Sequence, residues 1–235
     1  MNRSKRILMV VANPATSTTV GGPVGFWASE LTHAYHEFRH AGYEVTIASP
    51  NGGPVEFDGL SDPRDESGYS KDDVLSLGYI QSEEFMSLLE NTPAVTQFSA
   101  EEFDAIVVAG GQAPMFTFAE ATGLQTMFAE FYRRGKVSAA LCHGTSLLLY
   151  LEDDTGAPLV RGKTMTGFAN SEEDYADHIV GQKVMPFRIE DEALKLGANY
   201  VSKGAFEPFA VRDGHLVTGQ QQNSGRETAA LVIEA

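Results

Sequence analysis

The single cysteine of this chain stands where a nucleophile could be presented to a substrate. The apolar run Val137–Leu141 predicts a buried strand, and the segment His143–Leu151 directly after the cysteine predicts a helix. A nucleophile in such a strand-to-helix turn projects above the carboxyl edge of the sheet, and a helix N-terminus favours the thiolate form. We therefore expect Cys142 to be a nucleophile; the alternative is an inert buried thiol.

His143 follows the cysteine directly, and its imidazole could take the thiol proton during an attack. In nucleophilic triads a third group, often a carboxylate, orients this base. The acidic segment NSEEDYAD at residues 170–177 offers candidates, and the residues alone leave Glu172 and Glu173 open. The alternative interpretations are a structural histidine and a solvated acidic loop.

Paired glycines follow a second apolar run, in AGGQAP at residues 109–114. Glycine has no side chain, so its backbone N–H can approach a substrate closely. One N–H from this turn and one from the residue after Cys142 could together stabilise an oxyanion. The alternative is an ordinary strand-to-loop turn. The glycine patterns of phosphate loops and dinucleotide-binding turns do not occur in the sequence.

Glu30 falls on the apolar side of a predicted helix, Phe26–His40. A carboxyl among core residues costs free energy unless it is paired or protonated. A protonated carboxyl above a thiol could carry a proton during catalysis. The alternative is a glutamate at the surface.

Three histidines of the same predicted helix, His33, His36 and His40, are spaced by three and four residues. Two histidines at such spacing could bind zinc, but no acid or cysteine completes the set at a convincing spacing. We therefore interpret them as surface residues and predict no metal.

The wider pattern predicts alternating strands and helices. Strands are expected at Arg6–Ala12, Tyr43–Ala48, Phe103–Ala109, Val137–Leu141, Arg161–Phe168, Tyr200–Val211 and His215–Thr218. Helices are expected at Phe26–His40, Ala119–Arg134, His143–Leu151 and Arg226–Ile233, with further helical patterning at Asp72–Asn91. This order predicts an α/β fold with a doubly wound, mostly parallel sheet. We expect one domain over residues 1–235, with an inserted helical segment at about residues 50–100.

Composition excludes several classes of partner. The formal net charge is −15, which argues against a nucleic-acid partner and gives no basic surface for anionic membranes. No apolar run approaches the length of a bilayer span. One cysteine permits no internal disulfide, so we expect a reducing, cytoplasmic location.

The combination of these motifs resembles the ThiJ/PfpI superfamily, the class I glutamine amidotransferase-like proteins. Within it, the chain is similar to the branch of glutathione-independent glyoxalases, or D-lactate dehydratases, which also includes heat-shock holding chaperones. The resemblance extends over nearly the whole chain. It is carried by GGPVGFWASEL, SPNGGPVEFD, FDAIVVAGGQAPMF, AALCHG, GKTMTGFANSEE and DGHLVTGQQQNSG.

The resemblance implies a flavodoxin-like three-layer sandwich and a homodimer without a cofactor. It implies that Cys142 is the nucleophile, His143 its neighbouring base, and Glu30 the carboxyl that hydrogen-bonds the thiol. It favours Glu173 as the triad acid and implies that the N–H groups of Gly111 and His143 form the oxyanion hole.

One position departs from the branch. Its glyoxalases commonly read GGHG after the strand, whereas here Gln112 replaces the histidine, which leaves the substrate open. We expect a small 2-oxoaldehyde such as methylglyoxal as substrate, in a small pocket with Trp27 or Phe116 nearby. The alternatives are a holding chaperone or stress-response protein with a redox-sensing cysteine, and a cysteine hydrolase, amidase or deglycase.

Overall fold

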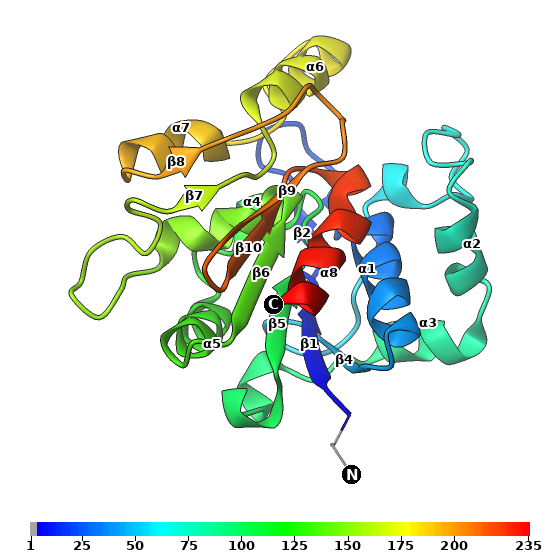
Figure 1. The fold of residues 1–235 in the computed structure, drawn as a ribbon. Coiled ribbons are helices and arrows are strands. Elements are labelled where there is room, and N and C mark those ends of the chain that lie inside the picture. Colours follow the sequence, from blue (N-terminus) through cyan, green and yellow to red (C-terminus); the bar gives the residue numbers. More distant parts are fainter. Residues whose placement is uncertain (1–3) are drawn as a thin grey trace.

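The computed structural model describes residues 4–235, and its centre is a six-stranded sheet (Figure 1). Its strands lie in the order β4 (Glu44–Ala48), β1 (Arg6–Val10), β5 (Ala105–Val108), β6 (Val137–Leu141), β10 (Leu216–Gly219) and β9 (Ala210–Asp213). The first five are parallel, and β9 is antiparallel to β10. The predicted mostly parallel sheet is therefore confirmed.

Helices cover both faces of this sheet. They are α1 (Ala28–His40), α2 (Val74–Ile80), α3 (Glu83–Glu90), α4 (Pro114–Thr117), α5 (Thr122–Arg133), α6 (Asn170–Val180), α7 (Ile189–Lys195) and α8 (Gly225–Glu234). Short 3-10 segments are η1 (Gly59–Ser61), η2 (Val95–Gln97), η3 (Ala100–Glu102), η4 (Cys142–Tyr150) and η5 (Gln222–Ser224). Two small ladders pair β2 (Ala15–Thr16) with β3 (Pro23–Val24), and β7 (Thr164–Met165) with β8 (Asn199–Tyr200).

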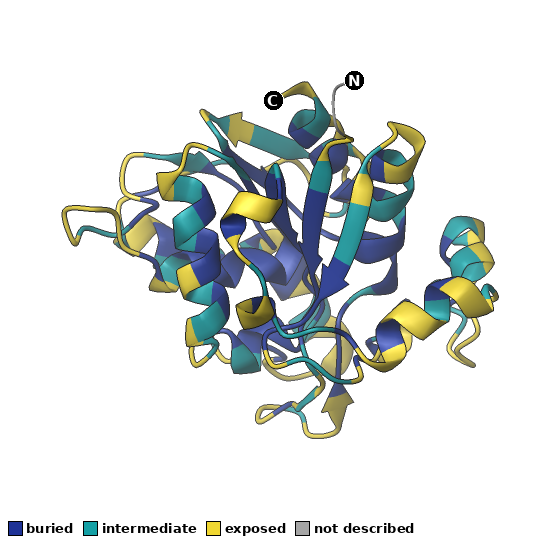
Figure 2. Cartoon of the chain, turned by 90° about the horizontal axis from the view of Figure 1, so that it is seen from below, coloured by how far each residue is buried: buried dark blue, intermediate teal, exposed yellow. Residues whose placement is uncertain are grey.

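The core lies in two layers, one on each side of the sheet. Alternate residues of a strand point to opposite faces. In β1, Ile7 and Met9 pack against α1 and α8, whereas Leu8 and Val10 pack against α5 and η4. Figure 2 shows the strands buried and the exposed residues on the outer helices and loops. This is the three-layer α/β sandwich that the resemblance implied.

The segment between β4 and β5 contains two helices beside α1 (Figure 1). The single helical pattern expected over Asp72–Asn91 is divided into α2 and α3. The Ser82 hydroxyl accepts a hydrogen bond from the Phe85 N–H at 3.3 Å and so caps a new helix one turn after α2 ends.

Three expected elements differ from the structure. The segment after Cys142 is a 3-10 helix, η4, rather than the expected α-helix, and only Thr164–Met165 of the strand expected at Arg161–Phe168 forms one. The strand expected at Tyr200–Val211 is wrong in its middle. Residues 201–209 between β8 and β9 form no strand, and Phe206 there has a φ of 63°, which no strand residue adopts.

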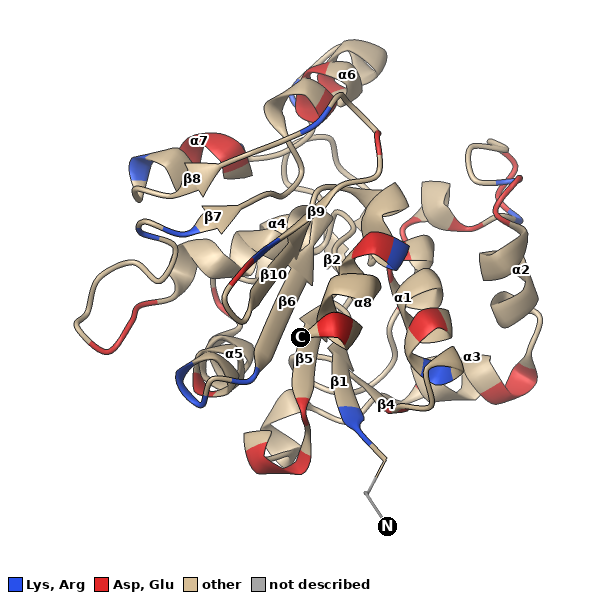
Figure 3. Cartoon of the chain, viewed as in Figure 1, with Lys and Arg blue, Asp and Glu red and all other residues tan. Residues whose placement is uncertain are grey.

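Charged residues lie mainly on the outer elements, with acidic side chains on α3, α6 and α7 (Figure 3). The segment expected to be an acidic cluster is the helix α6, which ends at Gly181 in the left-handed conformation with a φ of 79°. Within residues 4–235, no helix combines the length and apolar character needed to cross a membrane.

Candidate active site

The strand-to-helix turn presents Cys142 at the carboxyl edge of the sheet. Cys142 has a φ of 56°, a strained value for a residue other than glycine. A side chain at Gly144 would lie 2.7 Å from the Ala109 carbonyl oxygen, so this turn can pack on the end of β5 only with glycine. The thiol itself is buried, with 2% of the residue exposed. The local sequence thus fixes the thiol in one orientation.

Glu30 lies fully buried in the first turn of α1, beside the thiol. Its Oε2 accepts a hydrogen bond from the Gly110 N–H at 2.6 Å. Its carboxyl also interacts with the Cys142 thiol, although this contact falls short of ordinary hydrogen-bond geometry and leaves Oε1 without a conventional partner among residues 4–235. The pKa of Glu30 is raised to about 8, mainly by burial and to a smaller extent by the Asp58 carboxyl, while the contacts with the Cys142 thiol and the Gly110 N–H oppose the rise. Glu30 is therefore mainly protonated at neutral pH.

Burial also raises the pKa of the Cys142 thiol well above its usual range, and the negative charge of an ionised Glu30 adds to this rise. The backbone N–H groups of His143 and Gly111 oppose it because they point at the sulfur and stabilise the thiolate. Since Glu30 is mainly neutral at pH 7, the contribution of its charge is absent there. These two N–H groups are the pair expected for an oxyanion hole.

His143 connects the thiol to a second carboxyl, that of Glu173. The imidazole Nε2 lies 3.0 Å from Glu173 Oε1, and Nδ1 lies 3.8 Å from Cys142 Sγ. A carboxylate only accepts hydrogen bonds, so Nε2 carries the proton and the Nδ1 lone pair faces the sulfur. The ring also packs against Phe168, with 4.1 Å between the ring centroids. His143 is thus oriented as a base toward Cys142.

Glu172 is also buried but has a different role in the structure. Its carboxyl accepts hydrogen bonds from Ala169 N at 2.6 Å, Phe206 N at 3.0 Å and Gln220 Nε2 at 2.7 Å. These bonds join α6 to the loop at residues 201–209 and to the end of β10. The structure therefore brings Glu173, rather than Glu172, into contact with His143.

The turn after β5 is held by a buried carboxyl that sequence reasoning missed. Gly111 has a φ of 102°, and a Cβ atom there would lie 2.4 Å from the backbone nitrogen of Trp27. Gln112 donates from its backbone N–H and its Nε2 to the Asp58 carboxylate, at 3.3 and 3.0 Å. Burial raises the pKa of Asp58. No role was expected for Asp58 from the sequence.

A cavity of about 250 Å³ opens above the thiol. Cys142, His143, Glu173 and Gln112 are among its lining residues. Of the two aromatic residues expected nearby, Trp27 lines the cavity, whereas Phe116 is not among its described lining residues. The cavity gives a small molecule access to the sulfur.

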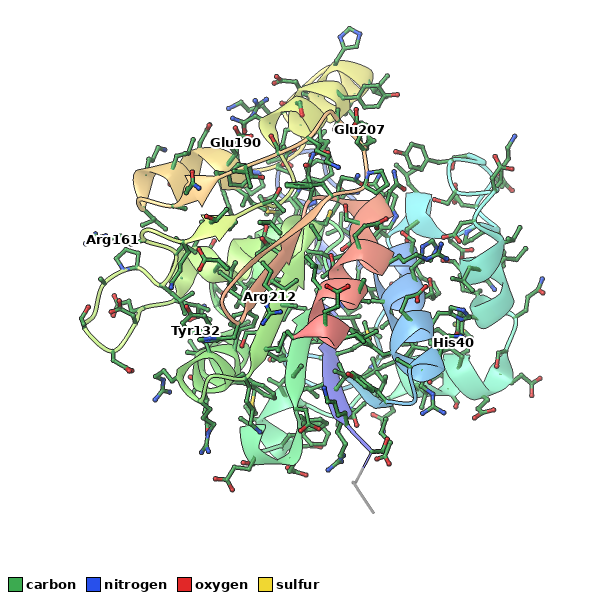
Figure 4. All side chains as sticks on the ribbon, in the orientation of Figure 1. His40, Tyr132, Arg161, Glu190, Glu207 and Arg212 are labelled. Carbon is green, nitrogen blue, oxygen red and sulfur yellow. The ribbon has the colours of Figure 1, made fainter. Side chains whose placement is uncertain are left out.

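The three histidines of α1 are not among the lining residues of this cavity. His33 pairs with Asp73 at 2.9 Å and His36 contacts the Tyr79 hydroxyl at 3.1 Å, so both are half-buried against the α2 segment rather than free at the surface. His40 is exposed at the far end of α1 (Figure 4). Among the described residues, no group of three or more His, Cys, Asp or Glu side chains is arranged so that it could hold a metal ion.

Comparison with known proteins supports the resemblance drawn from the motifs. Residues 23–235 match the model of the DJ-1/PfpI family. The glutathione-independent glyoxalase HSP31 of Saccharomyces cerevisiae is 30% identical, with 92% of this chain and 90% of that protein covered. Glyoxalase 3 of Candida albicans is 30% identical over 98% of both chains.

A solved structure agrees with these sequence matches. The crystal structure of glyoxalase III from Candida albicans superposes with a TM-score of 0.81 at 29% identity, covering 98% of this chain and 97% of that one. The expected ThiJ/PfpI relationship and fold are therefore confirmed. By sequence and by structure, this chain belongs to the DJ-1/PfpI family.

Proposed function

We propose that this protein is a glutathione-independent glyoxalase that converts a 2-oxoaldehyde and water to a 2-hydroxy acid. The observation that carries the proposal is the buried Glu30 carboxyl beside the Cys142 thiol, with a pKa of about 8. A hydrolase needs only a nucleophile, a base and an oxyanion hole. Isomerisation of a 2-oxoaldehyde needs in addition a group that takes a proton from one carbon and returns it to the next.

The first step is addition of the thiol to the aldehyde carbon. The sulfur bonds to that carbon while its proton moves to His143 Nδ1, and Glu173 stabilises the imidazolium. The N–H groups of Gly111 and His143 stabilise the negative oxygen. Glu30 gives this oxygen its proton, which leaves a neutral hemithioacetal and an ionised Glu30.

The second step moves hydrogen between the two carbons. Ionised Glu30 takes the proton from the former aldehyde carbon while the His143 imidazolium protonates the neighbouring oxygen, which produces an enediol. Glu30 then returns its proton to the second carbon, and His143 removes the proton of the first hydroxyl. The product is a thioester of the 2-hydroxy acid, and no external oxidant is required.

The third step is hydrolysis. Water adds to the thioester, and the carbon–sulfur bond breaks. The thiol and Glu30 regain their protons, His143 returns to its neutral form, and one proton is released with the 2-hydroxy acid anion. The enzyme is thus restored with Glu30 protonated.

Purified protein should convert methylglyoxal to D-lactate without glutathione, measured by loss of substrate and enzymatic assay of D-lactate. Cys142→Ala should abolish this turnover because no other described residue supplies the nucleophile. Leu194→Ser, an exposed position on α7, serves as control and should be fully active. Turnover that persists in Cys142→Ala contradicts the proposal. So does an inactive wild type whose thiol still reacts with an alkylating probe.

A further inference from the structure

The lining of the cavity above Cys142 is mostly apolar. Its few polar members besides the thiol are His143, Glu173, Gln112 and Gln222. Most of the other lining side chains are apolar, and many come from α6 and from the segments at residues 184–185 and 206. A substrate must place its reacting carbons at the thiol, so the part of the molecule beyond these carbons meets mainly apolar side chains.

The apolar lining extends to the surface along α6. Ile179 and Val180 line the cavity and are nevertheless 67% and 52% exposed, and Tyr175 on the same helix is 50% exposed. These large apolar side chains lie on one helix beside a cavity that reaches the thiol, and contiguous exposed apolar side chains mark ligand-binding grooves.

The side of α6 that faces away from the cavity carries charged residues. Asp174 and Asp177 pair with Arg188 at 2.6 and 3.1 Å, and Figure 3 shows acidic residues on α6. The helix therefore turns its ion pairs toward α7 and its apolar residues toward the cavity.

The apolar side chains of α6 that line the cavity, Tyr175, Ile179 and Val180, form what we call the apolar wall, and the loop at residues 201–209 supports it. Phe206 lines the cavity and packs on Tyr175, with 5.2 Å between the ring centroids. Its backbone is fixed by the hydrogen bond from its N–H to Glu172. The loop at residues 201–209, marked by Glu207 in Figure 4, runs close to α6. The wall is thus a built part of the site.

Methylglyoxal carries a single methyl group beyond its two reacting carbons, so it offers little apolar surface to this wall. We propose that the protein prefers 2-oxoaldehydes with a linear alkyl chain longer than a methyl group, and that α6 selects them through Ile179 and Val180. This inference rests on the proposed glyoxalase function and names the substrate class of the same site.

Each methylene that moves from water into the cavity should raise kcat/KM about fourfold. The test compares kcat/KM for methylglyoxal with that for its propyl and pentyl homologues, without glutathione. We expect a rise along the series. Equal or falling values, with methylglyoxal still converted, would overturn this inference and leave the proposed function intact. No conversion of any member would instead contradict the proposed function.

A matched pair of variants assigns the preference to α6. Ile179→Ser should lower the ratio of pentyl to methyl kcat/KM about 3- to 10-fold, because the alkyl chain loses its apolar neighbour. Leu194→Ser changes an apolar residue that is 51% exposed on α7 and does not line the cavity, so the ratio should stay at the wild-type value. Both positions are exposed, and equal melting temperatures establish that both variants fold. An unchanged ratio in Ile179→Ser would overturn the role of α6.

Discussion

Two carboxyl groups flank the thiol, and their surroundings differ. Glu30 has a backbone N–H and the thiol as its neighbours, and its pKa is raised to about 8. Glu173 is equally buried but contacts an imidazole nitrogen at 3.0 Å. The first carboxyl keeps its proton at neutral pH, whereas the second meets a partner that donates a hydrogen bond to it.

In the proposed mechanism, this difference lets one chemical group serve two purposes in a small site. A carboxyl without a cation nearby becomes a proton carrier, since its two protonation states have similar free energies near neutral pH. A carboxyl that faces imidazole fixes the tautomer of the base and stabilises its cationic form. The comparison can be tested by replacing each of these two glutamates with glutamine.

The largest effect is expected from Glu30→Gln. Glutamine can still accept from the Gly110 N–H, but it cannot carry a proton, so kcat/KM should fall by about 10²–10⁴-fold. In the wild type the first step needs protonated Glu30, so kcat/KM should decline as the pH rises through about 8. This decline should be absent from whatever activity the variant retains. An increase of wild-type kcat/KM through this range would contradict the assignment of Glu30 as the initial acid.

The same substitution should change the pH dependence of stability. Folded Glu30 keeps its proton up to about pH 8, whereas the unfolded chain loses it near 4.5, so the folded state binds more protons between these values. Wild-type stability should therefore fall as the pH rises, by about 3 kcal/mol between pH 6 and 9 relative to Glu30→Gln. Urea unfolding of both proteins at several pH values measures this. Parallel curves would show that Glu30 is not buried with its proton.

Glu173→Gln should have a smaller effect on activity and little on the fold. The amide oxygen can still accept from Nε2–H, but the negative charge that stabilises the imidazolium is lost. A hydrogen bond to a charged group contributes about 1.5–3 kcal/mol, which corresponds to a loss of about 10–100-fold in kcat. The decline above about pH 8 should persist, because Glu30 is unchanged. Disappearance of that decline would mean that the two carboxyls do not act independently.

Glu172→Gln serves as a control for Glu173→Gln. We expect this variant to lose stability rather than activity. Its carboxylate accepts from three donors, and an amide would turn its own N–H groups toward at least one of them. The loss should be about 1–3 kcal/mol, or about 2–10 °C in Tm. At temperatures where the variant is folded, its activity should exceed that of Glu173→Gln. A larger loss of activity in Glu172→Gln would reverse the roles of the two residues.

The sequence predicted the elements that carry short-range signals. The strand Val137–Leu141 has the predicted bounds, because a continuous apolar run between turn residues has few other solutions. Glu30 was expected in the core from helical periodicity, and it is fully buried. The position of Cys142 at the end of a central strand followed from the same local pattern.

The parts that were missed depend on contacts between distant residues. The loop at residues 201–209 has a β-forming sequence, but its backbone bonds instead to the side chains of Glu172, 34 residues from Phe206, and Gln220, 17 residues from Lys203. Asp58 gave no local signal, since its role arises from the contact with Gln112, 54 residues away. The choice between Glu172 and Glu173 depended on which side of α6 faces His143, and an acidic segment without predicted structure does not specify this.

Cys142 is the only cysteine of the chain, and this limits how the protein can recover from oxidation. Peroxide converts a reactive thiol to a sulfenic acid, which is normally rescued by condensation with a second, resolving thiol. This polypeptide has no such partner of its own, so the first thiol to reach the sulfenic acid must come from outside. Competition between that reductant and further oxidation to the irreversible sulfinic acid then determines the working lifetime of the protein under oxidative stress.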